Sequence, residues 1–214
     1  MNKKNEFRQT RTLTLLGLMT AIILILAVVP GLGFVPVGPI NATTLHIPVI
    51  ILAIVEGPVA GGVLGFIFGV ISMIRAILQP TPMSFIFMNP IVAIIPRVLI
   101  GLLTGYVYQV LKRKKTIGKL SIGIASGIGS LVNTVFVMGL IYLIYGQKYL
   151  DLSNELAAAK AASEGVEFIA NTSVIKLIGG IILTQGLAEM LVAILIATPI
   201  CFALLRGIKK RKKA

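Results

Sequence analysis

The sequence predicts an all-α membrane protein with six transmembrane helices, and three observations support this fold class. Hydrophobic residues make up 57% of the 214 residues and charged residues only 13%, against about 25% charged residues in a typical soluble domain. The mean hydropathy is +0.98. Finally, 15 of the 20 lysines and arginines fall into three clusters between apolar runs. We expect a single integral membrane domain, residues 1–214.

The basic clusters indicate topology rather than nucleic-acid binding. They lie within residues 3–11, 112–119 and 206–213, and such clusters are typical of cytoplasmic flanks. The net charge of +13 would suit a nucleic-acid partner, but the basic residues neither follow a helix face nor alternate with aromatic ones. The basic start followed by an apolar run resembles a signal peptide, but no good cleavage site follows it. We interpret it as a retained first helix.

The number of spans follows from one long apolar run and from charge. The run over residues 44–76 has 33 residues, whereas about 20 helical residues span a bilayer. Glu56, Gly57 and Pro58 form a turn signal inside it, with proline suited to a helix start. Splitting the run there places all three basic clusters in the cytoplasm, together with both termini. The predicted spans are therefore residues 12–29, 44–55, 58–76, 90–111, 118–145 and 176–205.

The loops predicted to face outward are longer than those facing inward. They cover residues 30–43, 77–89 and 146–175, so ligand-handling structure is expected on the outer side. The third loop contains "SNELAAAKAASEGVEF", in which Ser153 is a candidate N-cap for a short surface helix.

No catalytic motif is present, which disfavours an enzyme. The sequence has no nucleophile elbow, no phosphate-binding loop and no zinc-binding histidine pair. His46 is the only histidine and Cys201 the only cysteine. A membrane enzyme would need a reactive group at one interface, but His46 and Glu56 are predicted on opposite sides. We expect no metal and no cofactor.

A few polar residues at membrane depth are the candidate functional groups. A charged side chain at the centre of a span costs roughly 2.5–3.5 kcal/mol, so the environment of Arg97 must offset that cost. Either a ligand or an ion pair with Glu189 would do so. Asn133 could bind a ligand or a neighbouring helix, and His46 could be a simple boundary residue. The other candidates are Gln185, which is four residues before Glu189 and shares its helix face, together with Asn41 and Asn89 near the outer surface.

Glycines and other small residues predict close helix packing. Gly61, Gly62, Gly65 and Gly69 form a small-xxx-small ladder in the third span, and Gly17 and Ala21 form a shorter one in the first. Such faces usually pack within the chain, although one at the edge of a small bundle can contact another subunit.

This layout resembles the substrate-binding S components of energy-coupling factor (ECF) vitamin transporters. The similarity covers the whole chain and is strongest in "TLLGLMTAIILILAVVP" and "LHIPVIILAIVEGPVAGGVLGFIFGVISMI". In that family an Ala-x-x-x-Ala motif in the first span docks on the transmembrane T component, and here Gly17 replaces the first alanine while Ala21 keeps the second. The resemblance implies a high-affinity binding subunit of the bacterial cell membrane. It would work with a T component and two cytoplasmic ATPases, which hydrolyse the ATP.

The expected cargo is a small anionic vitamin. Flat-ring vitamins are commonly held by aromatic stacking, best on tryptophan, and this chain has no tryptophan. A buried arginine favours a carboxylate, and the chain looks most like the pantothenate-type S components. That resemblance assigns the carboxylate to Arg97 and an amide or hydroxyl to Asn133, with Phe34, Phe85 and Phe87 lining a lid. Other S-component cargoes (a pyridoxine-like vitamin, riboflavin, folate or a thiamine precursor) and a stand-alone secondary transporter are the alternatives.

Overall fold

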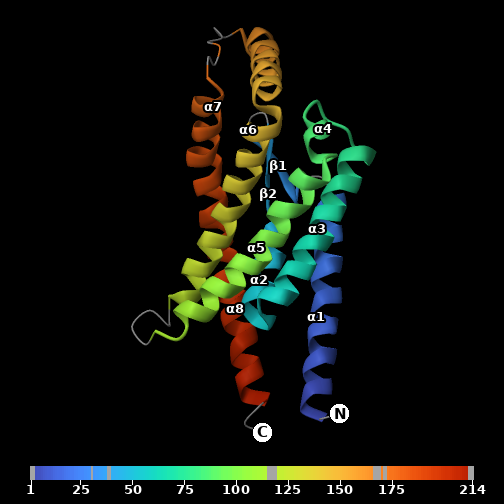
Figure 1. The fold of residues 1–214 in the computed structure, drawn as a ribbon, viewed down its shortest axis with the longest axis vertical. Helices are drawn as coiled ribbons and strands as arrows, with labels where there is room; N and C mark the ends of the chain where they lie inside the picture. Colours follow the sequence, from blue (N-terminus) through green and yellow to red (C-terminus); the bar gives the residue numbers. More distant parts are fainter. Residues whose placement is uncertain are drawn as a thin grey trace.

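The chain folds into a helical bundle with one short β-hairpin at one end (Figure 1). The computed structural model describes residues 3–29, 31–37, 40–114, 120–165, 170 and 173–211. The elements in chain order are α1 (Lys3–Val28), β1 (Phe34–Val37), β2 (Ile40–Thr43), α2 (His46–Glu56), α3 (Pro58–Leu78), α4 (Ser84–Phe87), α5 (Pro90–Leu111), α6 (Ser121–Glu164), α7 (Val174–Ile181), the π-helical turn η1 (Ile182–Gly186) and α8 (Leu187–Arg211).

Five helical segments are long and apolar enough to cross a membrane, as expected of a membrane bundle. They are Gln9–Val28, Pro58–Leu78, Pro90–Leu111, Ser121–Glu164 and Val174–Ile208. The second predicted span corresponds to α2, which has 11 residues and is therefore only about 16 Å long. The turn between α2 and α3 falls where the sequence predicts it, at Gly57, with Pro58 in the first turn of α3.

The helix ends that adjoin the basic clusters lie at one end of the bundle. Figure 1 shows the start of α1, the end of α5 and the end of α8 at the same end, whereas the β-hairpin, α4 and the far part of α6 lie at the other. We call the first of these the basic end and the second the hairpin end. The arrangement agrees with the predicted grouping of the basic clusters on one side of the membrane.

Two of the predicted outer loops contain regular structure that the sequence analysis did not expect. Within residues 30–43, β1 and β2 form an antiparallel hairpin in which Phe34 pairs with Thr43 and Val37 with Ile40. Within residues 77–89, α4 forms a single helical turn. Prolines and glycines obscure the hairpin in the sequence, because they are poor strand residues.

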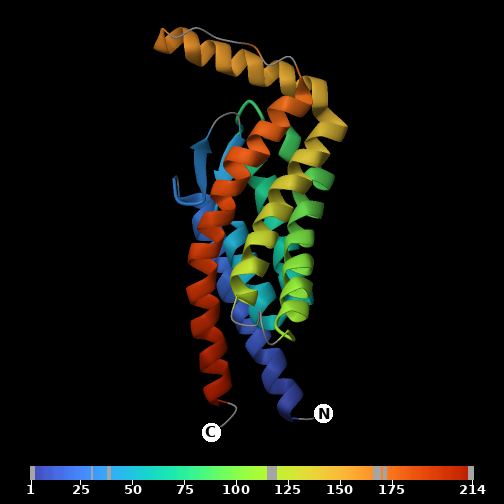
Figure 2. The same ribbon diagram turned by 90° about the vertical axis from the view of Figure 1, so that its left-hand side faces the viewer.

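The third outer loop contains the predicted helix, but the helix does not start where the sequence suggests. Ser153 is not an N-cap: it lies inside α6, which runs without interruption from Ser121 to Glu164 and ends at Gly165, a left-handed residue with φ 68°. Good helix formers on both sides of Ser153 explain this continuity. In Figure 2 the far part of α6 turns away from the bundle and lies across the hairpin end.

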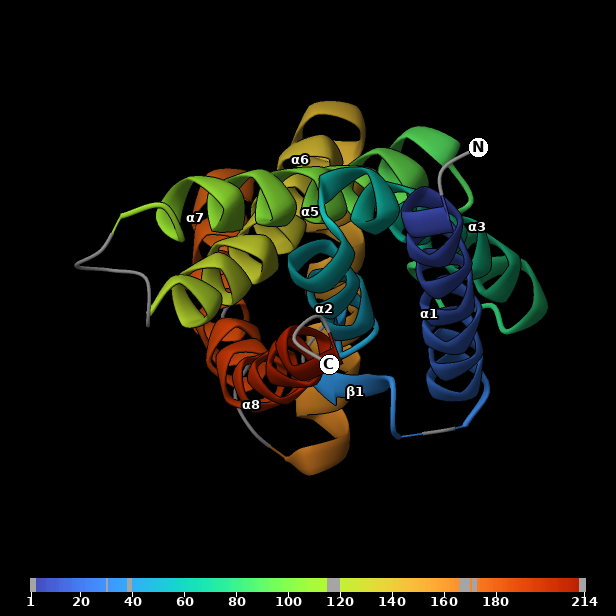
Figure 3. The ribbon, with the colours of Figure 1, turned by 90° about the horizontal axis from the view of Figure 1, so that it is seen from below.

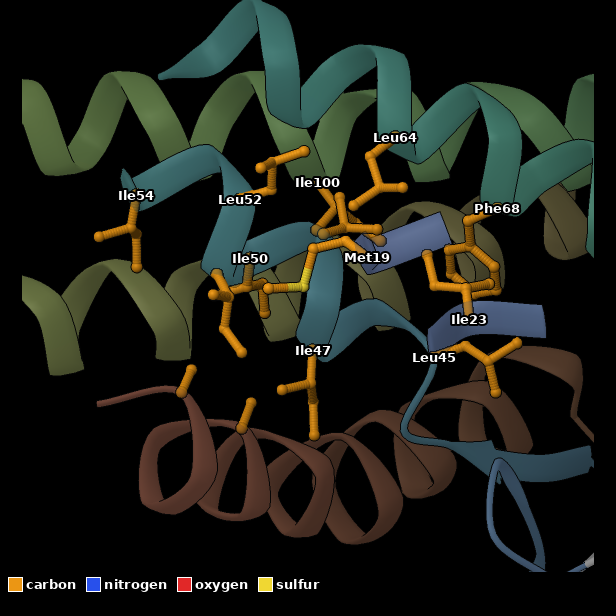
Figure 4. Close-up of a cluster of buried hydrophobic side chains, with 14 of the residues drawn as sticks. Met19, Ile23, Leu45, Ile47, Ile50, Leu52, Ile54, Leu64, Phe68 and Ile100 are labelled. Atoms are coloured by element: carbon orange, nitrogen blue, oxygen red, sulfur yellow. The ribbon is translucent and has the colours of Figure 1, made fainter. Parts of the chain in front are cut away.

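Helix α2 lies in the centre of the bundle, surrounded by the longer helices (Figure 3). Nine of its residues, His46 to Ile54, are buried. Figure 4 shows its isoleucines and leucines packed against Met19 and Ile23 of α1, Leu64 and Phe68 of α3, and Ile100 of α5. A helix that is apolar on all sides is usually buried on all sides. This position explains why α2 is an almost uninterrupted run of apolar residues in the sequence.

The predicted glycine ladder packs within the chain, against α5. A Cβ atom on Gly61 would lie 3.0 Å from the carbonyl oxygen of Gly101, and one on Gly69 would lie 2.8 Å from that of Ala93. One on Gly65 would overlap the carbonyl oxygen of Arg97. The two backbones therefore approach each other directly, as small-xxx-small faces allow.

A bidentate ion pair joins α1 to the turn between α2 and α3 at the basic end. Arg11 Nε and Nη2 donate to the two carboxylate oxygens of Glu56 at 2.9 Å, and Thr12 Oγ1 donates to Glu56 Oε2 at 2.7 Å. The Glu56 side chain is fully buried, whereas that of Arg11 remains partly exposed. The pair fixes the first helix to the core at this end.

Replacing Glu56 with glutamine is therefore expected to destabilise the protein by about 1–3 kcal/mol, because a buried partner of a bidentate pair is lost. Cys201 is the only cysteine in the sequence and it is buried, so a thiol-reactive fluorescent dye reports unfolding directly. The measurement is the melting temperature of the purified protein in detergent. Lys160→Gln, which breaks an exposed pair with Glu164, is the control and should leave the melting temperature unchanged.

Candidate functional site

A layer of polar side chains lies between two apolar clusters of the bundle. The same order recurs in three helices. In α5, Arg97 stands between Val92 of one cluster and Ile100 of the other. In α6, Asn133 stands between Ala125 and Val137, and in the last helical segment Gln185 and Glu189 stand between Ile178 and Ala193. We call this level of the bundle, with His46 and Thr43, the polar layer.

Arg97 is buried in the polar layer and held by aromatic rings. Its side chain is 5% exposed, and its Nη1 donates to the carbonyl oxygen of Val92 at 2.7 Å. The guanidinium carbon lies 5.4 Å from the centre of the Phe68 ring and 5.3 Å from that of Phe87. A cation over an aromatic face gains about 0.5–2 kcal/mol, so the two rings offset part of the cost of burial.

The alternative considered for Arg97, an ion pair with Glu189, is not found among the described residues. Within the described part of the chain, no carboxylate oxygen lies within 4.0 Å of the Arg97 guanidinium, and its Nε has no hydrogen-bond partner. The physical reason is that other groups already hold the Glu189 carboxylate.

Glu189 joins three elements of the fold. Its Oε1 accepts a hydrogen bond from the backbone N–H of Thr43 at 2.8 Å and a longer one, 3.4 Å, from Gln185 Nε2. Its Oε2 accepts a hydrogen bond from Thr134 Oγ1 at 3.0 Å. The carboxylate therefore connects the end of β2, helix α6 and the turn η1. The predicted side-by-side arrangement of Gln185 and Glu189 is confirmed.

Gln185 owes its inward position to a break in helix regularity. Residues Ile182–Gly186 form a π-helical turn between α7 and α8, and Gln185 and Gly186 are its buried residues. A Cβ on Gly186 would lie 3.2 Å from Thr134 Cγ2, so glycine permits the close approach to α6. Such single π-turns within helices occur frequently at functional sites.

His46 and Asn133 carry buried polar atoms without partners. His46 begins α2 and is 1% exposed, and neither ring nitrogen makes a hydrogen bond to a described residue. Asn133 is 4% exposed and its Oδ1 is likewise unpartnered. A buried polar atom without a partner costs about 1–3 kcal/mol. Together with Arg97 Nε, these atoms are available to a ligand.

Other candidate residues have structural contacts of their own. Asn89 caps α5, since its Oδ1 accepts from the backbone N–H of Ile91 at 3.0 Å, and its Nδ2 donates to the Tyr145 hydroxyl at 3.2 Å. Phe85 packs edge-on against Tyr145, with ring centres 5.5 Å apart. Among the three candidate lid residues, Phe87 contacts Arg97 directly. For Phe34 and Asn41, in β1 and β2, the structure describes the backbone pairing and not the side chains.

Three residues of the polar layer were missed by the sequence analysis. Phe68 reads as an ordinary core residue of a span, and only the structure shows its ring facing Arg97. Thr43 contributes a backbone N–H, which leaves no trace in a side-chain pattern. Thr134 could have been noticed as a second polar residue beside Asn133, because two adjacent polar residues are unusual in the middle of a span.

The polar layer can recognise an anion that also carries hydrogen-bonding groups. Arg97 supplies a planar set of donors suited to a carboxylate. Asn133 Oδ1 can accept from a hydroxyl or an amide N–H, and His46 can donate or accept. A small set of placed polar groups within apolar surroundings is the usual composition of a small-molecule site.

Comparison with known proteins identifies the family. Residues 11–201 match the family described as ECF transporter, substrate-specific component. The chain is 30% identical over 183 residues to the pantothenic acid transporter PanT of Lactococcus lactis subsp. cremoris, covering 79% of this chain and 80% of that protein. It is 29% identical over 196 residues to the pantothenate transporter PanT of Leuconostoc mesenteroides subsp. mesenteroides, covering 87% of this chain and 94% of that one. The chain therefore belongs to the ECF transporter S components, the substrate-binding subunits, and is a multi-pass protein of the bacterial cell membrane.

Proposed function

We propose that this S component binds pantothenate and delivers it to an ECF-type importer. The observation that carries the proposal is the environment of Arg97. Its guanidinium is buried between two phenylalanine rings and has no carboxylate partner within 4.0 Å in the described residues. A substrate carboxylate would supply the missing counter-charge, in a bidentate geometry that a guanidinium favours.

The remaining groups of the polar layer suit the rest of the same molecule. Pantothenate is an acyclic monocarboxylate with one amide and two hydroxyl groups. The unpartnered atoms of His46 and Asn133 would pair with these groups, with Gln185 beside them. Two relatives of about 30% identity are named pantothenate transporters, which supports the same cargo.

A ligand panel tests the cargo assignment. The purified chain in detergent is titrated by calorimetry with pantothenate, pyridoxine, riboflavin, thiamine and folate. Tight binding of pantothenate alone is the expected result. Tight binding of another vitamin with no response to pantothenate would refute the assignment while leaving the family membership intact.

The proposed topology has six crossings in one integral membrane domain. Helix α2, although short, completes one of them together with the β-hairpin, and the basic end faces the cytoplasm under the positive-inside rule. The hairpin end, with the hairpin, α4 and the far part of α6, faces outward. Substrate would then reach the polar layer from the outer side.

The proposed partners are a T component and two cytoplasmic ATPase subunits. In the isolated chain Gly17 and Ala21 of α1 are exposed, and a Cβ on Gly17 would meet no atom within 4 Å. Figure 3 shows α1 at the edge of the bundle. An open small-residue face in an edge helix lets another membrane helix approach closely.

Gly17→Leu is accordingly expected to prevent assembly with the partner subunits without changing substrate affinity. The added side chain would start in open space, because a Cβ at this position meets no atom within 4 Å, and it would fill the exposed face. The measurement is recovery of the T component and ATPases with the tagged chain after co-expression, alongside pantothenate titration of the isolated variant. Gly180→Leu, at another open glycine in α7, is the control and should assemble normally. Normal assembly of the Gly17 variant would rule out this docking face.

A further inference from the structure

The polar layer contains one fixed positive charge and one fixed negative charge. Arg97 and Glu189 are both buried in this layer. Yet they do not form an ion pair in the described structure. The guanidinium therefore keeps donors free for a ligand while a nearby carboxylate opposes its charge. In a site that only attracts anions, that carboxylate would weaken binding by charge repulsion.

Glu189 cannot turn away from the layer, because hydrogen bonds on both carboxylate oxygens fix it. One comes from the backbone of Thr43 and one from the side chain of Thr134, at 2.8 and 3.0 Å. Its side chain is 7% exposed, and the low dielectric of such a site strengthens charge interactions. The carboxylate is thus held within the polar layer, beside the other candidate groups.

The same bonds hold the chain segments that carry the candidate ligand groups. Thr43 lies three residues before His46, and Thr134 directly follows Asn133. The third donor, Gln185, is itself a candidate. Glu189 is therefore in a position to act on substrate selection both through its hydrogen bonds and through its charge.

We propose that Glu189 is a positioning residue that restricts the substrate to a single negative charge. The inference rests on the proposed function. With a monocarboxylate bound to Arg97, the layer carries one net negative charge. A second negative charge on the substrate would have only the Glu189 carboxylate as a charged neighbour, and the two would repel each other. Repulsion of this kind is a common way to exclude a close analogue. The substrate's other end must then be uncharged, with hydroxyl or amide groups.

The test compares three ligands that differ in charge. They are pantothenol, in which a hydroxymethyl group replaces the carboxylate, pantothenate, and 4′-phosphopantothenate, which adds a phosphate. Each is titrated into the full-length chain and into Glu189→Gln, which keeps the size of the side chain and one acceptor oxygen. In the variant, the preference for pantothenate over pantothenol should rise roughly tenfold, which corresponds to removing a charge repulsion of about 1.4 kcal/mol. The phosphorylated ligand should gain more than pantothenate does.

Thr134→Val is the matched control. It removes one hydrogen bond from Glu189 but changes no charge, so it should weaken all three ligands by a similar factor and leave their ratios as in the wild type. A change in these affinity ratios in Thr134→Val equal to the change in Glu189→Gln would show that geometry alone sets the selectivity, which would overturn the proposal.

The outcomes separate this inference from the cargo assignment. If the wild-type chain binds pantothenate and the ratios are unchanged in Glu189→Gln, the charge role of Glu189 is refuted and the proposed function stands. If the wild-type chain binds none of the three ligands, the proposed function fails and this inference fails with it. If Glu189→Gln does not fold, the wild-type titrations decide. Equally tight binding of 4′-phosphopantothenate and pantothenate would refute the exclusion of a second negative charge. Binding of 4′-phosphopantothenate at least roughly a hundredfold weaker than that of pantothenate would support it.

Discussion

Arg97→Gln is expected to weaken pantothenate binding roughly thirtyfold or more. The substitution removes the positive charge and most of the donors from a site that is buried between Phe68 and Phe87. Loss of one partner from a buried, hydrogen-bonded charge pair typically costs about 2–5 kcal/mol, and each 1.4 kcal/mol corresponds to about tenfold in affinity. Calorimetric titration of the purified variant measures the change.

Two further variants define what the arginine contributes. Arg97→Lys keeps the charge but not the planar pair of donors, so its affinity should fall between those of the wild type and the glutamine variant. Arg75→Gln, at a half-exposed arginine of α3, should bind normally. An Arg97→Gln protein that is folded and binds as tightly as the wild type would mean that Arg97 has no role in substrate recognition.

Gly65→Ala is expected to destabilise the contact between α3 and α5 next to the candidate site. A Cβ at this position would overlap the Arg97 carbonyl oxygen, and it would lie 2.7 Å from the carbonyl carbon and 3.1 Å from Val98 Cα. These are backbone atoms, so relief requires α3 and α5 to separate. Overpacking of this kind costs about 1–3 kcal/mol. The expected result is a lower melting temperature, read from the reactivity of Cys201.

The same substitution should also weaken pantothenate binding, because the separation of α3 from α5 moves Phe68 away from Arg97. Gly139→Ala in α6 is the control, since a Cβ there would meet no atom within 4 Å. It should leave both the melting temperature and the affinity unchanged. A Gly65→Ala protein as stable as the control would show that the bundle can relax at this contact.

The number and approximate positions of the long helices could be predicted from the sequence, because long apolar runs indicate the spans and turn residues mark their ends. The fourth span was predicted at residues 90–111 and the structure has α5 at Pro90–Leu111. The turn at Glu56 and Pro58 was equally clear. The hairpin was not predictable, because β1 and β2 contain proline and asparagine and pair only with each other. The extension of α6 past Ser153 was missed because a serine suits an N-cap and a helix interior alike.

The candidate site was predictable in its residues but not in its connections. Charged and amide side chains in apolar spans are conspicuous, so Arg97, Asn133 and Gln185 were identified without coordinates. The sequence could not show whether Glu189 pairs with Arg97, because that depends on competing donors. The backbone N–H of Thr43 and the hydroxyl of Thr134 hold the carboxylate, and neither bond follows from spacing. The π-turn at Ile182–Gly186 has no sequence signal either.

The central claim, that Arg97 binds the carboxylate of pantothenate, is tested most directly by a binding cycle. Pantothenate and pantothenol are titrated into the wild-type chain and into Arg97→Gln under identical conditions. The wild-type chain should prefer pantothenate by roughly thirtyfold or more, the equivalent of a buried charge pair, and the variant should bind the two ligands with nearly equal affinity. An Arg97→Gln protein that retains the full preference for pantothenate would place the carboxylate elsewhere and contradict the account.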